Sequence, residues 1–353
     1  MDGEGNRRIV AEFIGPEDER WRSLVEATAH DVYHLPAYAD VSARACGGEA
    51  LAFLGEVGGA TCLIPLIETK VPVEGWTEWS DLSSPYGYAS PLFSGNPARF
   101  GPLMRLFSLA ARGRGCASVF LRSHPFLTPP DTLAALADLG WTRRGETISI
   151  DLRKPEEQLW TELRKDHRAG LRRLQSKGFV TRFDHWSDYD AFVELYLATM
   201  SRVGARSSYF FSPAYFSALR ERLRAETHLC TVLSPEGRIA ATAQFFRSGD
   251  LVQGHLMGWN DEFKDVAPAK LTVWEIARWG RESGARALHL GGGRGGANDA
   301  LLHYKSGWSK DRLPYHTLGL VTDRATYDAI CAAAGTPPDG AFFPAYRAED
   351  TRS

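Results

Sequence analysis

The stretch ALHLGGGRGGANDALLHYKSGWS, residues 287–309, carries the pattern that most constrains the fold. Its first residues read as a buried strand, a glycine-rich turn follows, and a short helix runs toward Lys305. We expect Asn298 or Asp299 to cap this helix, with Lys305 about two turns further on. Local pattern leaves Lys305 two roles. It favours a surface charge, but the side chain can also point back over the strand ends.

Nucleotide-binding motifs do not describe this stretch. It comes late in the chain, and no acidic residue follows about 20 positions on at the end of a second parallel strand, as a dinucleotide fingerprint requires. No GK[ST] follows the glycines, so the stretch is not a Walker loop either. The pattern therefore predicts a strand, a flexible turn and a helix.

Composition indicates a soluble globular protein. The chain has 353 residues, enough for two domains, with 44% hydrophobic and 24% charged residues. The net charge of −2 argues against a protein coated in nucleic acid but permits a local basic patch. Five cysteines without a CxxC pair favour reduced thiols. Neither a signal peptide nor an apolar run of about 18 residues is evident, so we expect a cytoplasmic protein without a membrane span.

Hydrophobic periodicity predicts a mixed α/β chain (α+β) with two segments of similar make-up. The expected helices are residues 17–28, 97–115, 131–140, 155–178, 187–204, 213–226 and 268–284. The expected strands are two within 50–68 joined at Gly58-Gly59, then 116–126, 146–152, those within 227–259, 287–292 and 313–321. This repetition suggests a duplicated α/β unit with its boundary near residues 145–155.

The expected helix 155–178 has a strongly basic face. Between residues 160 and 177, six Lys/Arg stand against two carboxylates, Glu162 and Asp166, a local excess of four positive charges. The apolar stripe is Trp160, Leu163, His167, Leu171 and Leu174. The candidate residues for contact with phosphate are Arg164, Lys165, Arg168, Arg172 and Arg173. Such a face binds phosphate, as in a nucleic-acid partner, or is simply solvated.

The segment KDVAPAKL, residues 264–271, argues against coenzyme A. In the acetyltransferase superfamily a glycine-rich loop at a helix N-terminus presents backbone N–H groups to the pyrophosphate. Here the corresponding segment has no glycine, and Pro268 removes one donor. We therefore do not expect a standard coenzyme A cradle.

The order of motifs along the chain resembles the FemABX family of aminoacyl-tRNA-dependent peptidyl transferases, within the GNAT superfamily. The matching segments in the second half are Trp160–Gly178, Thr199–Gly204, Tyr215-Phe216, Trp274-Glu275, Leu290–Gly293 and Tyr304-Lys305. In the first half they are IPLIE, SSPYGYASP and FLRSHPF. Each motif is weak alone, but together they cover nearly the whole chain in a specific order.

The resemblance implies two tandem GNAT-like domains, each with a mostly antiparallel sheet flanked by helices. Residues 1–148, completed by 313–353, would form the acceptor side, and residues 149–312 the aminoacyl-tRNA side. The implied reaction transfers an amino acid from aminoacyl-tRNA to an amine, forming an amide. Aminoacyl-tRNA is then a co-substrate, and no cofactor or metal is expected. The sequence indicates no oligomeric state.

The resemblance also assigns roles to individual residues. Lys305, with Tyr304 beside it, would stabilise the anionic tetrahedral intermediate, as a fixed cation does in a dry site. Arg202 and Arg206 would hold an anionic acceptor. The further expected substrate-binding residues are Tyr86, Tyr209, Gly292 and Gly293, the glycines keeping side chains away from a substrate channel.

Several assignments stay open at this stage. The acceptor amine loses its proton to the substrate or to a carboxylate such as Asp81, and Tyr86 and Tyr88 either face the acceptor or brace their loop. His255 and His289 are expected to be core histidines. Ser42 stands where relatives often carry a lysine, which weakens the case for a UDP-linked acceptor. The expected acceptor is a small peptide-like, phosphonate-like or cell-wall-precursor amine. The alternatives are an acyl-CoA-dependent N-acyltransferase and a non-catalytic binding module.

Overall fold

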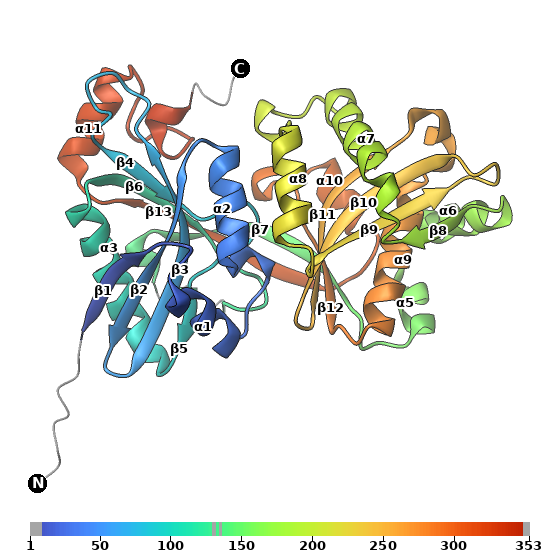
Figure 1. Cartoon of the computed structure of the whole chain (residues 1–353), viewed down its shortest axis with the longest axis horizontal. Coiled ribbons are helices and arrows are strands. Elements are labelled where there is room, and N and C mark those ends of the chain that lie inside the picture. Colours follow the sequence, from blue (N-terminus) through green and yellow to red (C-terminus); the bar gives the residue numbers. More distant parts are fainter. Residues whose placement is uncertain (1–8, 129–131, 134–135, 349–353) are drawn as a thin grey trace, which may run out of the picture. The chain divides into compact units, whose positions relative to one another are not determined.

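A computed structural model describes residues 9–128, 132–133 and 136–348 of the chain (Figure 1). The chain divides into two compact units: residues 1–143 with 315–353, and residues 144–314. These boundaries fall a few residues from the expected ones. Assigning unit 1 to the acceptor and unit 2 to tRNA stays a prediction.

Unit 1 is built on a sheet in the order β1-β2-β3-β4-β6-β13, with β5 on β3. The strands are β1 Val10–Ile14, β2 Glu49–Val57, β3 Ala60–Lys70, β4 Ser80–Ser83, β5 Leu92–Ser94, β6 Cys116–Arg122 and β13 Arg312–Val321. Pairing is antiparallel except between β4 and β6. The predicted hairpin joins β2 to β3 at Gly58-Gly59, where both residues have positive φ, as a tight turn of this hand requires.

Helices cover this sheet (Figure 1). They are α1 Glu19–Ala27, α2 Pro36–Ala45, α3 Phe100–Gly113 and α11 Arg324–Ala333. Phe107 of α3 packs with Phe53 and Leu121 in one core, while Trp21 of α1 and Ala39 of α2 pack with Leu63 in another. The expected helix 131–140 lies partly outside the described residues, and its described part contains a 3₁₀ turn at Ala137–Leu139.

Unit 2 has a sheet in the order β7-β12-β11-β10-β9-β8. The strands are β7 Trp141–Asp151, β8 Val180–Phe183, β9 Thr227–Leu233, β10 Ile239–Ser248, β11 Leu251–Trp259 and β12 Ala287–Gly292. The helices are α5 Glu156–Glu162, α6 Lys165–Ser176, α7 Tyr189–Arg202, α8 Pro213–Arg222, α9 Ala269–Glu282 and α10 Ala300–Lys305. The predicted α+β class with mostly antiparallel sheets is confirmed.

Helices pack on both faces of the unit 2 sheet. Successive side chains of a strand point to opposite faces, and those in the middle of β10 are buried on both. Val252 and Phe245 join Trp274 and Ile276 of α9 in one core. The backbone of α7 lies very near Gly258: a Cβ added to Gly258 would be 2.4 Å from the carbonyl carbon of Leu195. Within the described residues, no helix combines the length and apolar character needed to cross a membrane.

The single helix expected over 155–178 is wrong. Two helices, α5 and α6, replace it, because Leu163 and Arg164 have extended backbone. The Arg164 N–H donates to the carbonyl of Gly307 at 2.8 Å, and the Arg168 guanidinium donates to the carbonyls of Thr161 and Leu163 at the end of α5. These tertiary and capping contacts satisfy the groups that the break leaves unpaired.

Candidate active site in unit 2

The pairing of β11 with β12 is short. These parallel strands pair only from Leu251–Gln253 to Ala287–His289. Beyond these residues β11 continues along β10 to Trp259, and β12 continues along β7 to Gly292. Near its carboxyl end β12 therefore no longer pairs with β11, although it still pairs with β7. The Lys305 side chain approaches this end of the sheet.

Lys305 reaches the end of β12 through a tightly capped turn. Asp299 is the N-cap of α10, accepting from the N–H of Leu302 at 2.9 Å, and its other oxygen accepts from the N–H of Arg294 at 3.1 Å. The Lys305 Nζ atom donates to the carbonyl of Gly292 at 2.8 Å. The structure therefore places the lysine over the strand end, one of the two roles that the sequence left open.

Burial tunes the charge of Lys305. Desolvation lowers its pKa to about 8, and Asp299 partly opposes this change. The ammonium form therefore predominates at neutral pH. A desolvated cation in a fixed position can stabilise negative charge that develops on a reacting carbonyl oxygen.

Gly292 and Gly293 have a structural reason to lack side chains. A Cβ at Gly292 would lie 2.7 Å from the carbonyl oxygen of Glu146, and one at Gly293 would lie 2.0 Å from that of Ala297. Both glycines are thus required by contacts inside unit 2. They allow the chain to fold tightly, and the Gly292 carbonyl accepts from Lys305; that they also clear a substrate channel stays a prediction.

Tyr304 belongs to the core rather than beside the ammonium group. Its ring packs against those of His167 and Trp308, with centroids 5.2 and 6.2 Å apart, and its hydroxyl is buried. Burial raises its pKa. These contacts favour a packing role for Tyr304, because neighbouring helix residues point in different directions, and its catalytic role stays a prediction.

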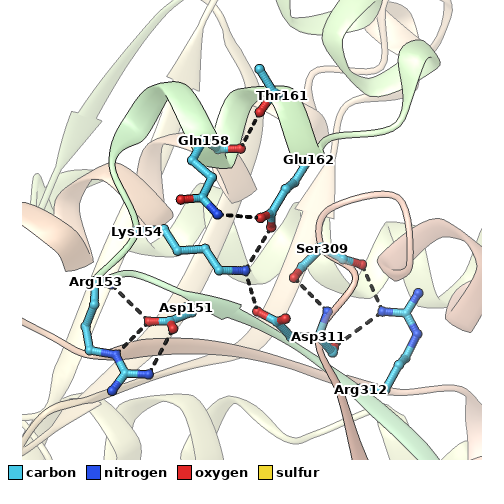
Figure 2. A network of polar contacts seen from close by, with 9 residues as sticks. All are labelled: Asp151, Arg153, Lys154, Gln158, Thr161, Glu162, Ser309, Asp311 and Arg312. Carbon is cyan, nitrogen blue, oxygen red and sulfur yellow. Dashed lines mark hydrogen bonds and ion pairs between the residues drawn. The ribbon is translucent and has the colours of Figure 1, made fainter.

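A polar network fixes the segment that follows α10 (Figure 2). The Nζ atom of Lys154 lies 2.9 Å from Glu162 Oε2 at the end of α5 and 3.0 Å from Asp311 Oδ2. The side chain of Lys154 is 21% exposed, so these ion pairs are shielded. Arg312 donates to the carbonyl of Ser309 at 2.8 Å. The segment beyond Lys305 is thus tied to the same unit.

The basic face of α6 is largely engaged within unit 2. Arg164 pairs with Asp166 at 2.6 Å, and Arg168 caps α5 as described above. The guanidinium of Arg172 lies 5.6 Å from the centre of the Trp160 ring, and Arg173 donates to the carbonyl of Asp265. Lys165 is exposed. Four of the five residues expected to contact tRNA therefore also hold α6 in place.

Arg202 and Arg206 differ in their surroundings. Arg202 donates to the carbonyl of Trp259 at 2.6 Å and to Thr199 Oγ1 at 3.0 Å, so it fastens α7 to β11. Arg206 is exposed, and among the described residues no carboxylate pairs with it. The carbonyl of Tyr209, which is partly buried, accepts from the Tyr196 hydroxyl. Arg206 is thus better placed than Arg202 to meet an anionic ligand.

Asp81 and Tyr86 belong to unit 1. The Asp81 carboxylate is 5% exposed and accepts from Ser118 at 2.6 Å, from Arg347 at 2.8 Å and from the Tyr346 hydroxyl. A carboxylate held by these donors anchors the C-terminal segment, which favours a structural role; its role as a general base stays a prediction. Tyr86 is 39% exposed, and its carbonyl accepts from the Tyr38 hydroxyl. Tyr88 packs edge-on against Tyr33 and Tyr315, which favours its bracing role.

Backbone N–H groups at the N-terminus of α9 are hydrogen-bonded to nearby carbonyls of the same segment. The N–H groups of Lys270 and Leu271 donate to the carbonyls of Ala267 and Pro268 at 3.1 and 2.9 Å. Pro268 has no N–H to offer. The donors that hold a pyrophosphate at a helix N-terminus are thus depleted here.

His289 is a core residue, as expected, and His255 is partly buried. His289 is fully buried, with Nδ1 2.9 Å from Gln253 Oε1. His255 lies beside Phe246 and Tyr215, and burial lowers its pKa to about 3. Among residues 9–128, 132–133 and 136–348 there is no group of three or more His, Cys, Asp or Glu that can hold a metal.

Sequence reasoning assigned His167 only to an apolar stripe. The structure shows that His167 and Arg164 contact the carbonyls of Tyr304 and His303, the two residues before Lys305. A histidine at the start of a basic helix carries no signal for such a contact, because its partner lies 137 residues away in the chain.

Comparison with known proteins agrees with this architecture. Residues 161–306 match the model of the acetyltransferase (GNAT) domain. A crystal structure of FemX superposes with a TM-score of 0.69 at 14% identity, covering 90% of this chain and 99% of FemX. No curated protein matches the sequence.

Two further solved structures share the fold. L-PGS from Bacillus licheniformis superposes with a TM-score of 0.55 at 16% identity, covering 90% of this chain and 96% of that one. The C-terminal domain of a putative lysylphosphatidylglycerol synthetase from Agrobacterium fabrum gives 0.55 at 17% identity, covering 89% and 93%. Residues 161–306 are therefore similar to the acetyltransferase (GNAT) domain, and the chain has the fold of FemX, as the FemABX resemblance implied.

Proposed function

We propose that this protein is an aminoacyltransferase that moves an amino acid from aminoacyl-tRNA to the amine of a small anionic acceptor. The observation that carries the proposal is the desolvated Lys305 ammonium, held on Gly292 where β12 ends. The GNAT domain match and the FemX-like fold support acyl transfer, and the FemABX resemblance supports aminoacyl-tRNA as the donor.

The chemistry needs a cation more than a nucleophile. The acceptor amine attacks the ester carbonyl of the aminoacyl-tRNA, a C–N bond forms, and negative charge develops on the carbonyl oxygen. The C–O bond to the tRNA ribose then breaks, and the amine proton passes to the departing ribose oxygen. Lys305 would stabilise the oxyanion, which in a site excluded from water lowers the barrier by several kcal/mol, about 3 or more.

The partners are proposed from charge and exposure. Lys165 and Lys177 are exposed on the basic face of α6, so they can meet tRNA phosphates without breaking internal contacts. Arg206 is the residue we propose for the anionic group of the acceptor. The acceptor class is a peptide-like, phosphonate-like or cell-wall-precursor amine.

An acyl-CoA-dependent N-acyltransferase is the second candidate, because the GNAT domain match covers residues 161–306. The committed amides of Lys270 and Leu271, together with Pro268, argue against it. Micromolar affinity for coenzyme A, measured by titration, would favour this candidate.

The deciding experiment incubates the protein with total tRNA charged with radiolabelled amino acids and a panel of amine acceptors. We expect amide formation that ribonuclease pretreatment abolishes and that acetyl-CoA cannot replace. Lys305→Ala serves as the inactive control. Transfer that needs an acyl-CoA and survives ribonuclease would overturn the proposal.

A further inference from the structure

The start of α6 contacts the end of the Lys305-bearing helix through three backbone carbonyls. Arg164 Nη1 lies 2.9 Å from the carbonyl oxygen of His303, and the Arg164 N–H lies 2.8 Å from that of Gly307. Between them, His167 Nε2 lies 3.1 Å from the carbonyl oxygen of Tyr304. The Tyr304 carbonyl also accepts from the Gly307 N–H at 3.1 Å, so His167 is the second group at this oxygen. Cationic or N–H groups near a helix C-terminus stabilise the carbonyls there.

His167 is built into this position from all sides. Its side chain is fully buried, and Nδ1 lies 3.1 Å from Asp166 Oδ2. Its ring centroid lies 4.6 Å from that of Trp308. Position 307 must be glycine, because a Cβ there would lie 2.8 Å from His167 Nε2.

The contact made by Nε2 has a specific chemical meaning. A carbonyl oxygen only accepts, so this contact is a hydrogen bond in the forms of His167 that carry a hydrogen on Nε2. Nδ1 also faces an acceptor, Asp166 Oδ2, and both nitrogens donate at once only in the imidazolium. The carbonyl of Tyr304 belongs to the peptide bond that joins Tyr304 to Lys305. A donor placed here therefore sets the direction in which the Lys305 backbone, and then its side chain, leaves the helix.

We propose that His167 is a positioning residue for Lys305: its Nε2–H holds the Tyr304–Lys305 peptide so that Nζ reaches the carbonyl of Gly292. The consequence for catalysis rests on the proposed transferase function. The positioning itself can be measured without any substrate.

The test compares three variants that differ in where a donor remains. His167→Gln keeps an N–H near the place of Nε2, His167→Asn keeps one near that of Nδ1, and His167→Ala keeps neither. His185→Ala is the matched control, because the His185 side chain is 52% exposed. Melting temperature and circular dichroism are recorded for each, and the Gln and Asn pair is compared at a temperature where both are folded.

The first readout is labelling of Lys305 by acetic anhydride from pH 6 to 10, followed by mass spectrometry of its peptide. We expect slow labelling with a midpoint near pH 8 in the wild-type chain, His167→Gln and His185→Ala. In His167→Asn and His167→Ala, the midpoint should move toward the ordinary lysine value of about 10.4, with a higher limiting labelling rate once the amine is neutral.

The second readout is steady-state transfer. We expect kcat to fall about tenfold to a hundredfold in His167→Asn and His167→Ala, since a misplacement of about 1 Å can cost that much, with KM for the acceptor little changed. His167→Gln should keep most of the wild-type kcat.

The outcomes separate the two proposals. If Lys305 labels alike in every variant, or if Gln and Asn release it equally, the positioning role of His167 is overturned. If labelling shifts as expected but the wild-type chain transfers no amino acid, the positioning role stands and the proposed function fails.

Discussion

The Nζ atom of Lys305 lies 2.8 Å from the carbonyl oxygen of Gly292, the last residue of β12. This contact joins a short helix to the strand end where β11 and β12 no longer pair. Replacing Lys305 with alanine should lower kcat at least a hundredfold, on the scale of losing one oxyanion-stabilising group. Radiolabelled amide formation measures this effect.

The matched control for that substitution is Lys310→Ala, at an exposed position in the same unit. Both variants should unfold at or above the wild-type temperature, because alanine at position 305 removes the cost of a desolvated charge. Full activity in Lys305→Ala would sink the proposed role of this residue.

The pH profile should follow the ammonium form of Lys305. Its pKa lies near 8, below the ordinary value of 10.5, so the cation is present below about pH 8 and is lost as the pH rises through that value. We expect kcat to decline about tenfold per pH unit on the alkaline side. Lys305→Arg should remove this decline, because arginine keeps its charge; an unchanged alkaline limb in that variant would assign the titration to another group.

Asp81→Asn should affect stability rather than turnover. The carboxylate is buried and paired with Arg347 and Tyr346, so neutralising it removes the charge that faces the Arg347 guanidinium and weakens both contacts. We expect a loss of about 3–5 kcal/mol in the free energy of unfolding, measured in urea, with kcat within about twofold. Asp138→Asn, at a side chain that is 59% exposed, is the control. A large drop in kcat without loss of stability would restore Asp81 as the base.

Gly293→Ala should disturb the turn that leads to α10. A Cβ at this position would lie 2.0 Å from the carbonyl oxygen of Ala297, so the backbone must shift. We expect a loss of about 1–3 kcal/mol in stability and a lower kcat. Gly113→Ala, where a Cβ meets nothing within 4 Å, should be neutral or stabilising. Equal effects of the two substitutions would contradict this account of the turn.

Substitutions of Arg202 and of Arg206 should have different effects on acceptor binding and on stability. Arg206→Ala should raise KM for the acceptor about tenfold, the cost of one charge-assisted hydrogen bond. Arg202→Ala should lower stability by about 1–2 kcal/mol instead, because it holds the carbonyl of Trp259. Melting curves and acceptor titrations of both variants distinguish these effects; an acceptor KM unchanged in Arg206→Ala would remove that residue from the binding site.

Much of the fold could be read from local pattern. The hairpin at Gly58-Gly59, the strand 287–292 and the cap at Asp299 all stand where turn chemistry and alternation predict them. The helix 155–178 was misread because periodicity continues through Leu163 and Arg164, while the backbone there is extended. The break depends on the hydrogen bond from the Arg164 N–H to the carbonyl of Gly307, a residue far away in the chain.

The candidate site was predicted in part. Motif order singled out Lys305, but it also named Tyr304 and Asp81, whose polar groups are buried in internal contacts. Their residue types suit catalysis, but residues distant in sequence hydrogen-bond to Asp81 and pack against Tyr304. His167 was missed for the converse reason, since its partner is a backbone carbonyl that no side-chain pattern reveals.

The sequence by itself determined the class of fold, the strand–turn–helix unit around residues 287–305 and the lysine most suited to the chemistry. These follow from hydrophobic period, turn residues and motif order, which are local properties of the chain. Tertiary structure alone decided which charged groups are free to act. Burial and hydrogen bonding to distant segments set the pKa of Lys305, occupied Asp81 and Arg202, and aligned His167 with the lysine peptide. Such effects depend on which atoms meet in space, and sequence spacing does not contain that information.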